Sequence, residues 1–226
     1  MNARTDVVDE DAARRLLGRG AAVVLPNPAP LTYVVAGTDP GGVNTAKGRP
    51  ADQPVALWAH DLGTFTESAR GMDLDAGGVE LAGRLLEEER ITLLVPLRPG
   101  HAHPDWLAPA SQEGWALLFG ARWSPLLPVL EPFPVLYVSS ANRTGHPPVA
   151  SAEAARGMFP HTPVLDGADV LDVPDGGTSA GRRATTTLRL SREGTFSLHR
   201  HGAQDQPYPT AQAYLDALRA RLRTPA

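Results

Sequence analysis

The sequence contains no cysteine in 226 residues. This absence excludes disulfide bonds, thiolate catalysis and cysteine-ligated zinc, but it leaves the redox compartment undetermined. Long hydrophobic runs are also missing, since apolar segments such as residues 91–95 are far shorter than the ~18 residues that a membrane span needs. The opening segment, MNARTDVVDE, has no apolar signal core. We therefore expect a soluble, cytoplasmic protein with no membrane partner.

Positive charge is the second feature in short supply. The chain has 21 Lys and Arg against 25 Asp and Glu, a formal net charge of -4 and a pI near 6.0. Non-specific nucleic-acid binding depends on cations that neutralise phosphates, so stable binding to nucleic acid is not expected. Any polyanion that the protein binds must be small or recognised locally.

The remaining composition, 42% hydrophobic and 20% charged, suffices for the core of one domain. Apolar or β-branched runs bounded by Pro and Gly predict strands, and capped amphipathic stretches predict helices. The expected strands cover residues 21–26, 54–59, 91–97, 115–119, 135–139, 184–190 and 195–200, and the expected helices cover residues 9–17, 79–90, 151–159 and 210–223. Strands alternate with helices in the middle and follow one another near the end, which indicates an α/β domain with a twisted mixed β-sheet and flanking helices.

Two cations flank a glycine in Lys47-Gly48-Arg49-Pro50, shortly before the strand expected at residues 54–59. A guanidinium offers a planar set of donors and an ammonium a mobile point charge, so the pair can converge on one phosphate or carboxylate. A solvated basic turn could have the same sequence. The motif alone does not decide between a turn and an anion site.

A second polar segment, residues 139–145, follows the strand expected at residues 135–139. Small hydroxyl and amide side chains at the carboxyl end of a strand lie where open α/β sheets bind ligands, and they can donate to phosphate oxygens. The same side chains can also do no more than cap a turn. Ser140 and Asn142 are the candidates here.

Together the two segments resemble the YrdC-like family, whose known enzymes make threonylcarbamoyladenylate from threonine, bicarbonate and ATP. The family pattern K-x-R-P-x-x-x-P, followed about ninety residues later by S-A-N-x-x-G-x-P-P, reads KGRPADQP from Lys47 and SANRTGHPP from Ser140. Further on, ATTTL at residues 184–188 resembles the family's Ser-Thr strand, and HRHGA at residues 199–203 resembles the end of the next strand. The resemblance implies one YrdC-like domain over residues 8–203 with a concave ligand cavity, and a helical extension over residues 204–226.

The resemblance also assigns roles residue by residue. Four residues would be catalytic and would hold the phosphates of ATP or the carboxylated intermediate: Lys47, Arg49, Ser140 and Asn142. Further nucleotide contacts would come from Thr185, Thr186, Thr187 and Arg200. The amino-acid substrate would lie beside Asn27, Thr32 and Tyr33. Mg²⁺ would bridge the phosphates with few protein ligands.

The chain also departs from the family pattern. The P-T-[DE]-x-x-[YF]-G segment that helps to form the family's threonine pocket reads PNPAPLTY at residues 26–33, without the acidic residue and without the glycine. The family's W-P-G-P-[LV]-T motif is reduced to residues 89–92, and an arginine expected near Phe119 is replaced by Gly120, with Arg122 close enough in sequence to substitute. The anion half of the site is therefore retained better than the half that binds threonine.

Three functions stay open. The chain could make threonylcarbamoyl-AMP and pyrophosphate as a nucleotidyltransferase, it could carbamoylate or adenylate another small amine or acid, or it could be a non-catalytic module that binds a nucleotide or an RNA end. The sequence does not decide between tRNA processing and a small-molecule pathway, nor does it give the oligomeric state. It also does not tell whether the turn-rich loop at residues 172–177 forms a lid.

Paired histidines at residues 101 and 103 and at residues 199 and 201 have a spacing that could place two imidazoles on one side of a strand. Neither pair has an obvious acidic third ligand. We expect ordinary surface histidines and no metal site built from protein ligands alone.

Overall fold

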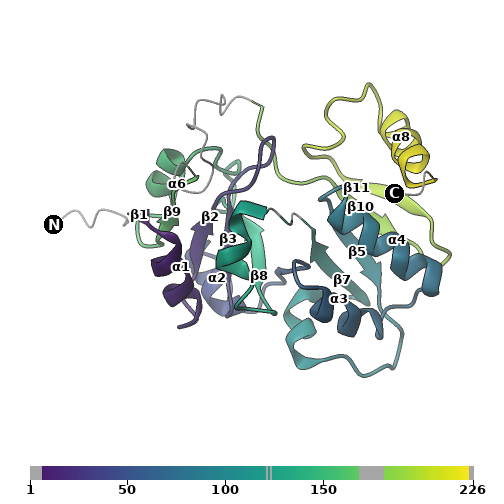
Figure 1. Cartoon of the computed structure of the whole chain (residues 1–226), viewed down its shortest axis with the longest axis horizontal. Coiled ribbons are helices and arrows are strands. Elements are labelled where there is room, and N and C mark those ends of the chain that lie inside the picture. The colour runs from purple at the N-terminus through teal and green to yellow at the C-terminus, as the bar shows by residue number, and fades with distance from the viewer. Residues whose placement is uncertain (1–6, 121, 123, 168–180, 224–226) are drawn as a thin grey trace.

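The computed structural model describes residues 7–120, 122, 124–167 and 181–223. Within these residues one twisted sheet of eleven strands runs through the molecule (Figure 1). Its hydrogen-bonded order is β1 (Val7–Val8), β9 (Val164–Leu165), β2 (Val23–Leu25), β3 (Val34–Gly37), β8 (Tyr137–Ser140), β4 (Ala56–Trp58), β7 (Trp115–Phe119), β5 (Thr92–Pro96), β10 (Thr187–Leu190) and β11 (Phe196–Arg200), with β6 (Ser111–Gln112) paired to β7. Parallel pairs such as β4 with β7 and antiparallel pairs such as β3 with β8 occur together, so the predicted mixed sheet is confirmed.

The helices begin where the sequence supplies caps. The described α-helices are α1 (Glu10–Leu17), α2 (Pro40–Ala46), α3 (Leu62–Ala69), α4 (Ala76–Glu87), α5 (Leu127–Leu130), α6 (Ala152–Met158) and α8 (Ala211–Arg223), and the short 3₁₀ helices are η1 (Asp105–Ala110) and η2 (Ser124–Leu126). Side-chain oxygens of Asp9, Asp39, Asp61, Asp75 and Ser151 accept hydrogen bonds from first-turn N–H groups of α1, α2, α3, α4 and α6. The four helices expected from the sequence are therefore all present, within a few residues of their predicted ends.

Alternate residues of the central strands pack into two hydrophobic clusters, one on each face of the sheet. In β4, Leu57 belongs to the cluster that includes Leu85 of α4, whereas Trp58 belongs to the cluster that includes Leu17 of α1. Both faces are covered, which explains why the central strands read as continuous apolar runs.

Some elements were missed by the sequence patterns. Strand β3 follows a proline-rich segment that obscures its start, and α3 carries glycine and β-branched residues that weaken a helical pattern. The strand expected at residues 184–190 begins only at Thr187, because the preceding backbone bonds to the segment after β11: the N–H of Ala203 donates to the carbonyl of Ala184 at 2.9 Å.

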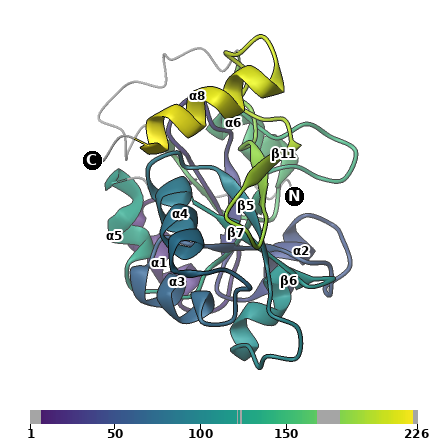
Figure 2. The same ribbon diagram turned by 90° about the vertical axis from the view of Figure 1, so that its right-hand side faces the viewer.

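Helix α8 lies along β11, as Figure 2 shows. Tyr214, Leu215 and Leu218 of this helix belong to the same hydrophobic cluster as the central strands. The segment predicted as an extension beyond residue 203 is thus packed into the core of a single domain. None of the helices in the described residues has the length and apolar character that crossing a membrane would require.

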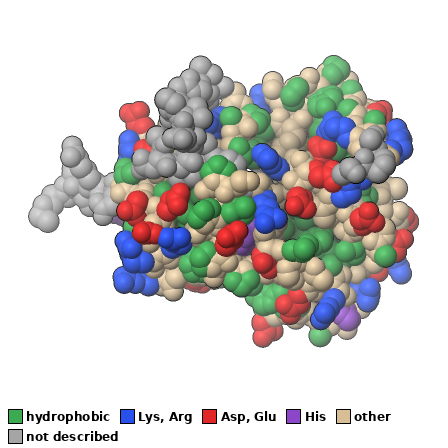
Figure 3. All heavy atoms as spheres, viewed as in Figure 1, with side chains coloured by type: hydrophobic (Ala, Val, Ile, Leu, Met, Phe, Trp, Pro, Cys, Tyr) green, Lys and Arg blue, Asp and Glu red, His purple; other side chains and the backbone are tan. Residues whose placement is uncertain are grey.

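Acidic and basic side chains are interspersed over the face of the molecule seen in Figure 3. The charges on that face form no broad basic surface of the kind that attracts nucleic acid.

Candidate functional site

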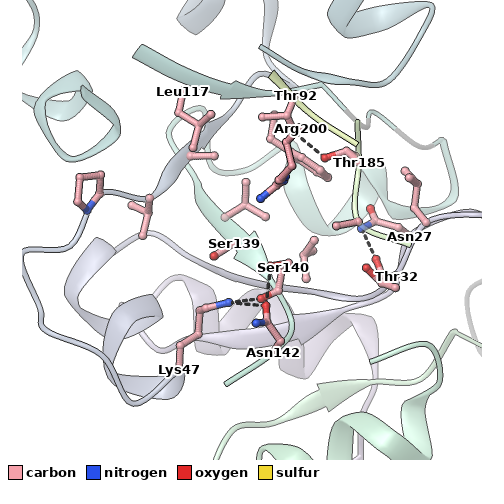
Figure 4. Close-up of a pocket in the computed structure, with 18 of the residues that line it drawn as sticks. Asn27, Thr32, Lys47, Thr92, Leu117, Ser139, Ser140, Asn142, Thr185 and Arg200 are labelled. Atoms are coloured by element: carbon pink, nitrogen blue, oxygen red, sulfur yellow. Dashed lines mark hydrogen bonds between the residues drawn. The ribbon is translucent and has the colours of Figure 1, made fainter. Parts of the chain in front are cut away.

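A cavity of about 400 Å³ is lined by residues of the central strands β3, β4, β5, β7 and β8 and by residues of the segment that follows α2. Figure 4 shows Lys47, Ser140 and Asn142 on one wall, Asn27 and Thr32 on another, and Thr92, Thr185 and Arg200 on a third. Its polar and charged lining consists of Asn27, Thr32, Lys47, Arg49, Thr92, Ser139, Ser140, Asn142, Thr144, Thr185 and Arg200. Eight of the eleven residues that the sequence singled out therefore line one cavity.

The first wall joins the KGRP and SAN segments. Lys47 is the C-cap of α2, and its Nζ donates to the backbone carbonyl of Ser140 and, at 3.1 Å, to Oδ1 of Asn142. Oγ of Ser140 donates to the same Oδ1 at 2.6 Å. The Asn142 amide donates in turn to the carbonyl of His146 at 3.0 Å. These hydrogen bonds fix the orientation of the Asn142 carboxamide at the cavity surface.

The cavity is strongly cationic. Lys47 is only 4% exposed, and its pKa is lowered from 10.5 to about 7, mainly by burial and in addition by the charges of Arg49 and Arg200. Among the described residues that line the cavity there is no Asp or Glu. Two guanidinium groups and a lysine amine, with no carboxylate in the described lining, indicate a site for an anion.

Arg49 is held by a residue that the sequence patterns did not identify. Asn44 is fully buried in α2, and its Oδ1 accepts a hydrogen bond from Nε of Arg49. Its amide donates to the carbonyls of Ala51 at 2.9 Å and Gln53 at 2.7 Å. Within the described part of the chain, Nη2 of Arg49 is buried without a hydrogen-bond partner. Asn44 therefore positions the guanidinium and leaves one of its donors available to a ligand.

The second wall is formed by the proline-rich segment. The amide of Asn27 donates to the carbonyl of Thr32 at 2.9 Å, while its Oδ1 is buried with no partner among the described residues. Asn27 is 1% exposed. Nη1 of Arg182 donates to the carbonyls of Asn27 at 3.1 Å and Leu31 at 3.0 Å, which holds this segment in place. The unpartnered Oδ1 is suited to an N–H or O–H donor.

The third wall contains hydroxyls and one cation. The hydroxyls of Thr92 and Thr185 lie 2.5 Å apart and share a hydrogen bond, and Arg200 extends from the end of β11 (Figure 4). Leu117 and Phe119, which point to the same side of β7, close this part of the cavity with apolar surface. Thr92 was overlooked as a site residue, although it is the threonine retained at the end of the reduced motif at residues 89–92. Side chains along β7 point alternately to the two faces of the sheet, and this alternation is the sequence signal that could have identified Leu117.

Three predicted site residues do not line the cavity. Tyr33 immediately precedes β3 and lies between Thr32 and Val34, which both line the cavity. Its side chain points to the opposite side of the backbone and packs in the hydrophobic core. Thr186 is fully buried, and its hydroxyl donates to Oδ1 of Asp205 at 2.6 Å. Thr187 is a buried residue paired in the sheet with β5 and β11. Their assignment to the substrate or nucleotide surface is therefore corrected to a structural role.

Arg122 does not replace the arginine expected near Phe119. It lies outside the cavity, with Nη1 3.5 Å from Oε1 of Glu87. Gly120 has a packing reason, because a Cβ at this position would lie 2.5 Å from Cα of Leu86. The loop at residues 172–177, considered as a lid, lies outside the described residues.

The histidine pairs give no sign of a metal centre. The rings of His101 and His103 have centroids 5.9 Å apart in an edge-to-face arrangement, while His201 pairs with Asp205 at 2.6 Å. Across the residues that the structure describes, no group of three or more His, Asp or Glu side chains could hold a metal ion.

Comparison with known proteins gives matches in structure but not in sequence. No protein-family model and no curated protein sequence matches the chain. P. abyssi Sua5 complexed with L-threonine matches with a TM-score of 0.61 and 20% identity over 87% of this chain and 56% of that chain. E. coli YciO matches with a TM-score of 0.61 and 13% identity over 90% and 96% of the two chains. HypF in a phosphate- and nucleotide-bound form matches with a TM-score of 0.58 and 14% identity over 87% and 29%.

These likenesses show the fold. The chain has the YrdC-like architecture that the KGRP and SAN motifs predicted, and it spans little more than half of the Sua5 chain.

Proposed function

We propose that the chain binds ATP in this cavity and uses it to form a carbamoyl-adenylate. The amine of an amino acid and bicarbonate would give a carbamate and water, and a carbamate oxygen would attack the α-phosphorus of ATP with release of pyrophosphate. The observation that carries the proposal is the convergence of Lys47, Arg49 and Arg200 on one cavity whose described lining contains no carboxylate. Such an arrangement would bind polyphosphate and offset the charge that develops during transfer.

The cavity side chains suit a reaction that depends on positioning. Lys47 and Arg49 would hold phosphate or carboxylate oxygens as charged donors, and the Thr92 and Thr185 hydroxyls would contact the nucleotide. Mg²⁺ would supply further charge compensation when it enters with ATP. The described lining offers hydroxyls and amides but no carboxylate, so Mg²⁺ would be held mainly by the nucleotide that carries it, with few protein ligands.

The amine substrate would lie beside Asn27. Its unpartnered Oδ1 would accept a hydrogen bond from the amine, and Thr32 lines the same wall. The complex of P. abyssi Sua5 with L-threonine supports threonine as the first substrate to test. The altered sequence of residues 26–33 makes another small amino acid the second.

The test measures pyrophosphate release from magnesium ATP with bicarbonate and each of the common amino acids, with the adenylate product identified by mass spectrometry. Replacing Lys47 with alanine should lower turnover by about 100-fold or more, since charged groups at transferring phosphates contribute effects of this size. Arg49→Ala should have a similar effect. Arg122→Ala removes the same charge outside the cavity and should leave turnover unchanged.

Unchanged turnover in Lys47→Ala would overturn the assignment. ATP binding without pyrophosphate release, with every amino acid tested, would instead support a nucleotide-binding module that has kept the fold and lost the reaction.

A further inference from the structure

The chain contains a single lysine, Lys47, among its 21 Lys and Arg residues. Every other cationic position is arginine. An arginine side chain stays protonated in proteins and is no nucleophile, whereas a lysine amine can lose its proton and react. This one lysine of the sequence is 4% exposed and lines the cationic cavity.

The hydrogen bonds of Lys47 are compatible with a neutral amine. Its Nζ has two acceptors, the Ser140 carbonyl and Oδ1 of Asn142. A neutral amine donates two hydrogen bonds and keeps one lone pair, so both N–H groups can be satisfied while the lone pair stays available. Desolvation and the two neighbouring guanidinium groups bring the pKa of Lys47 to about 7, so that much of it is unprotonated at neutral pH.

The groups that face Lys47 would stabilise a negatively charged group attached to its Nζ. Arg49 comes from the segment after α2 and Arg200 from β11, and the described cavity lining has no Asp, Glu or His. Nη2 of Arg49 is a buried donor with no partner among the described residues. The cavity, at about 400 Å³, has ample room for a group of three heavy atoms.

We propose that Lys47 is a site of reversible carbamylation by CO₂. The lone pair of Nζ forms a bond to the carbon of CO₂, one C–O π pair moves onto oxygen, and one N–H proton passes to solvent. The products are a carbamate anion on Lys47 and one proton. Arg49 and Arg200 stabilise that anion, and the cavity gains a negative charge where it had an amine, so carbamylation opposes the binding of phosphates at the same wall.

The experiment needs neither ATP nor an amino acid, and its outcome is therefore independent of the proposed reaction. The full chain is equilibrated with ¹³C-bicarbonate, carbamates are trapped by ethylation with triethyloxonium ion, and the modified residues are located by peptide mass spectrometry. Free α-amino groups in general titrate at about pH 8, so the α-amino group of the chain serves as an internal positive control.

The matched control is the double variant Lys47→Arg with Arg192→Lys. Arg192 has a 73% exposed side chain, 3.4 Å from Asp73, so a lysine there stays protonated. At about pH 7.5 the unprotonated fraction of Lys47 exceeds that of an exposed lysine by roughly a hundredfold or more, and the trapped yield should differ accordingly. Trapped ¹³C-carbamate on Lys47 but not at position 192 is the expected result. Absence of the adduct on Lys47 while the α-amino group is labelled, or an equal yield at position 192, would overturn the proposal.

Discussion

Nζ of Lys47 donates a hydrogen bond to Oδ1 of Asn142 across 3.1 Å, although the two residues are 95 positions apart in the chain. This contact ties the C-terminal end of α2 to the loop after β8. Because Ser140 donates to the same oxygen, the two motifs form one hydrogen-bonded network on a single cavity wall. The geometry of this wall and the charge state of Lys47 are therefore coupled.

The first prediction concerns the pH dependence of stability. The pKa of Lys47 is lowered in the folded protein, from 10.5 to about 7, so between these values the unfolded chain binds the extra proton. The destabilising contribution of Lys47 is fully present below pH 7 and is lost as the pH rises toward 10.5. Relative to Lys47→Met, the wild-type chain should gain unfolding free energy with rising pH, at up to about 1.4 kcal/mol per pH unit. Urea unfolding of both proteins from neutral to alkaline pH measures the difference, and a flat difference would contradict the shifted pKa.

The second prediction concerns Asn44 as a positioning residue. Asn44→Ala removes the acceptor of Arg49 and two hydrogen bonds to the loop at residues 49–54, and it should lower the free energy of unfolding by about 2–3 kcal/mol. If ATP binds in the cavity, its affinity should fall as well, because the guanidinium loses its fixed orientation. Thr45→Ala, on the exposed side of the same helix, should change neither quantity appreciably. Calorimetric titration with ATP and thermal unfolding test the pair, and equal effects of the two substitutions would exclude the role of Asn44.

The third prediction concerns Gly202, which lets the segment after β11 approach the start of β10. A Cβ at position 202 would lie 2.6 Å from the carbonyl oxygen of Ala184 and closer still to the backbone of Thr185 and Thr186. Gly202→Ala should therefore destabilise the protein by about 2–3 kcal/mol and displace Thr185.

Gly157 of α6 is the control for that substitution. A Cβ at position 157 would have no neighbour within 4 Å, so Gly157→Ala should stabilise the chain by about 0.5–1 kcal/mol through helix propensity. Thermal unfolding of the two variants gives the comparison. If the Gly202→Ala protein is as stable as the Gly157→Ala protein, the segment after β11 and the start of β10 can move apart at little cost in free energy.

The long, strongly patterned elements could be predicted from the sequence. Strands β5 and β7 and helices α4 and α8 are marked by apolar periodicity, whereas β3 and α3 carry weak local signals and depend on tertiary packing. The KGRP and SAN segments, which the sequence singled out, both contribute side chains to the same cavity. Motif spacing could not reveal on which side of the backbone Tyr33 or Thr186 points, because this depends on strand register and on where the pairing of β10 begins. Asn44 acts through contacts with a loop that no sequence pattern predicts.

The last prediction concerns Tyr214 on α8. This side chain is fully buried, and its hydroxyl has no hydrogen-bond partner among the described residues. Tyr214→Phe removes the unsatisfied polar atom and keeps the ring, so the free energy of unfolding should rise by about 1 kcal/mol.

Tyr208 is the matched control, because its ring centroid lies 5.3 Å from that of Tyr214 and its hydroxyl accepts a hydrogen bond from Arg221 at 3.0 Å. Tyr208→Phe should lower the free energy of unfolding by about 0.5–1 kcal/mol. Urea denaturation of both variants decides the matter: if Tyr214→Phe is the more destabilised of the two, the Tyr214 hydroxyl must have a partner such as a buried water, and α8 is held to the core by a polar contact as well as by apolar packing.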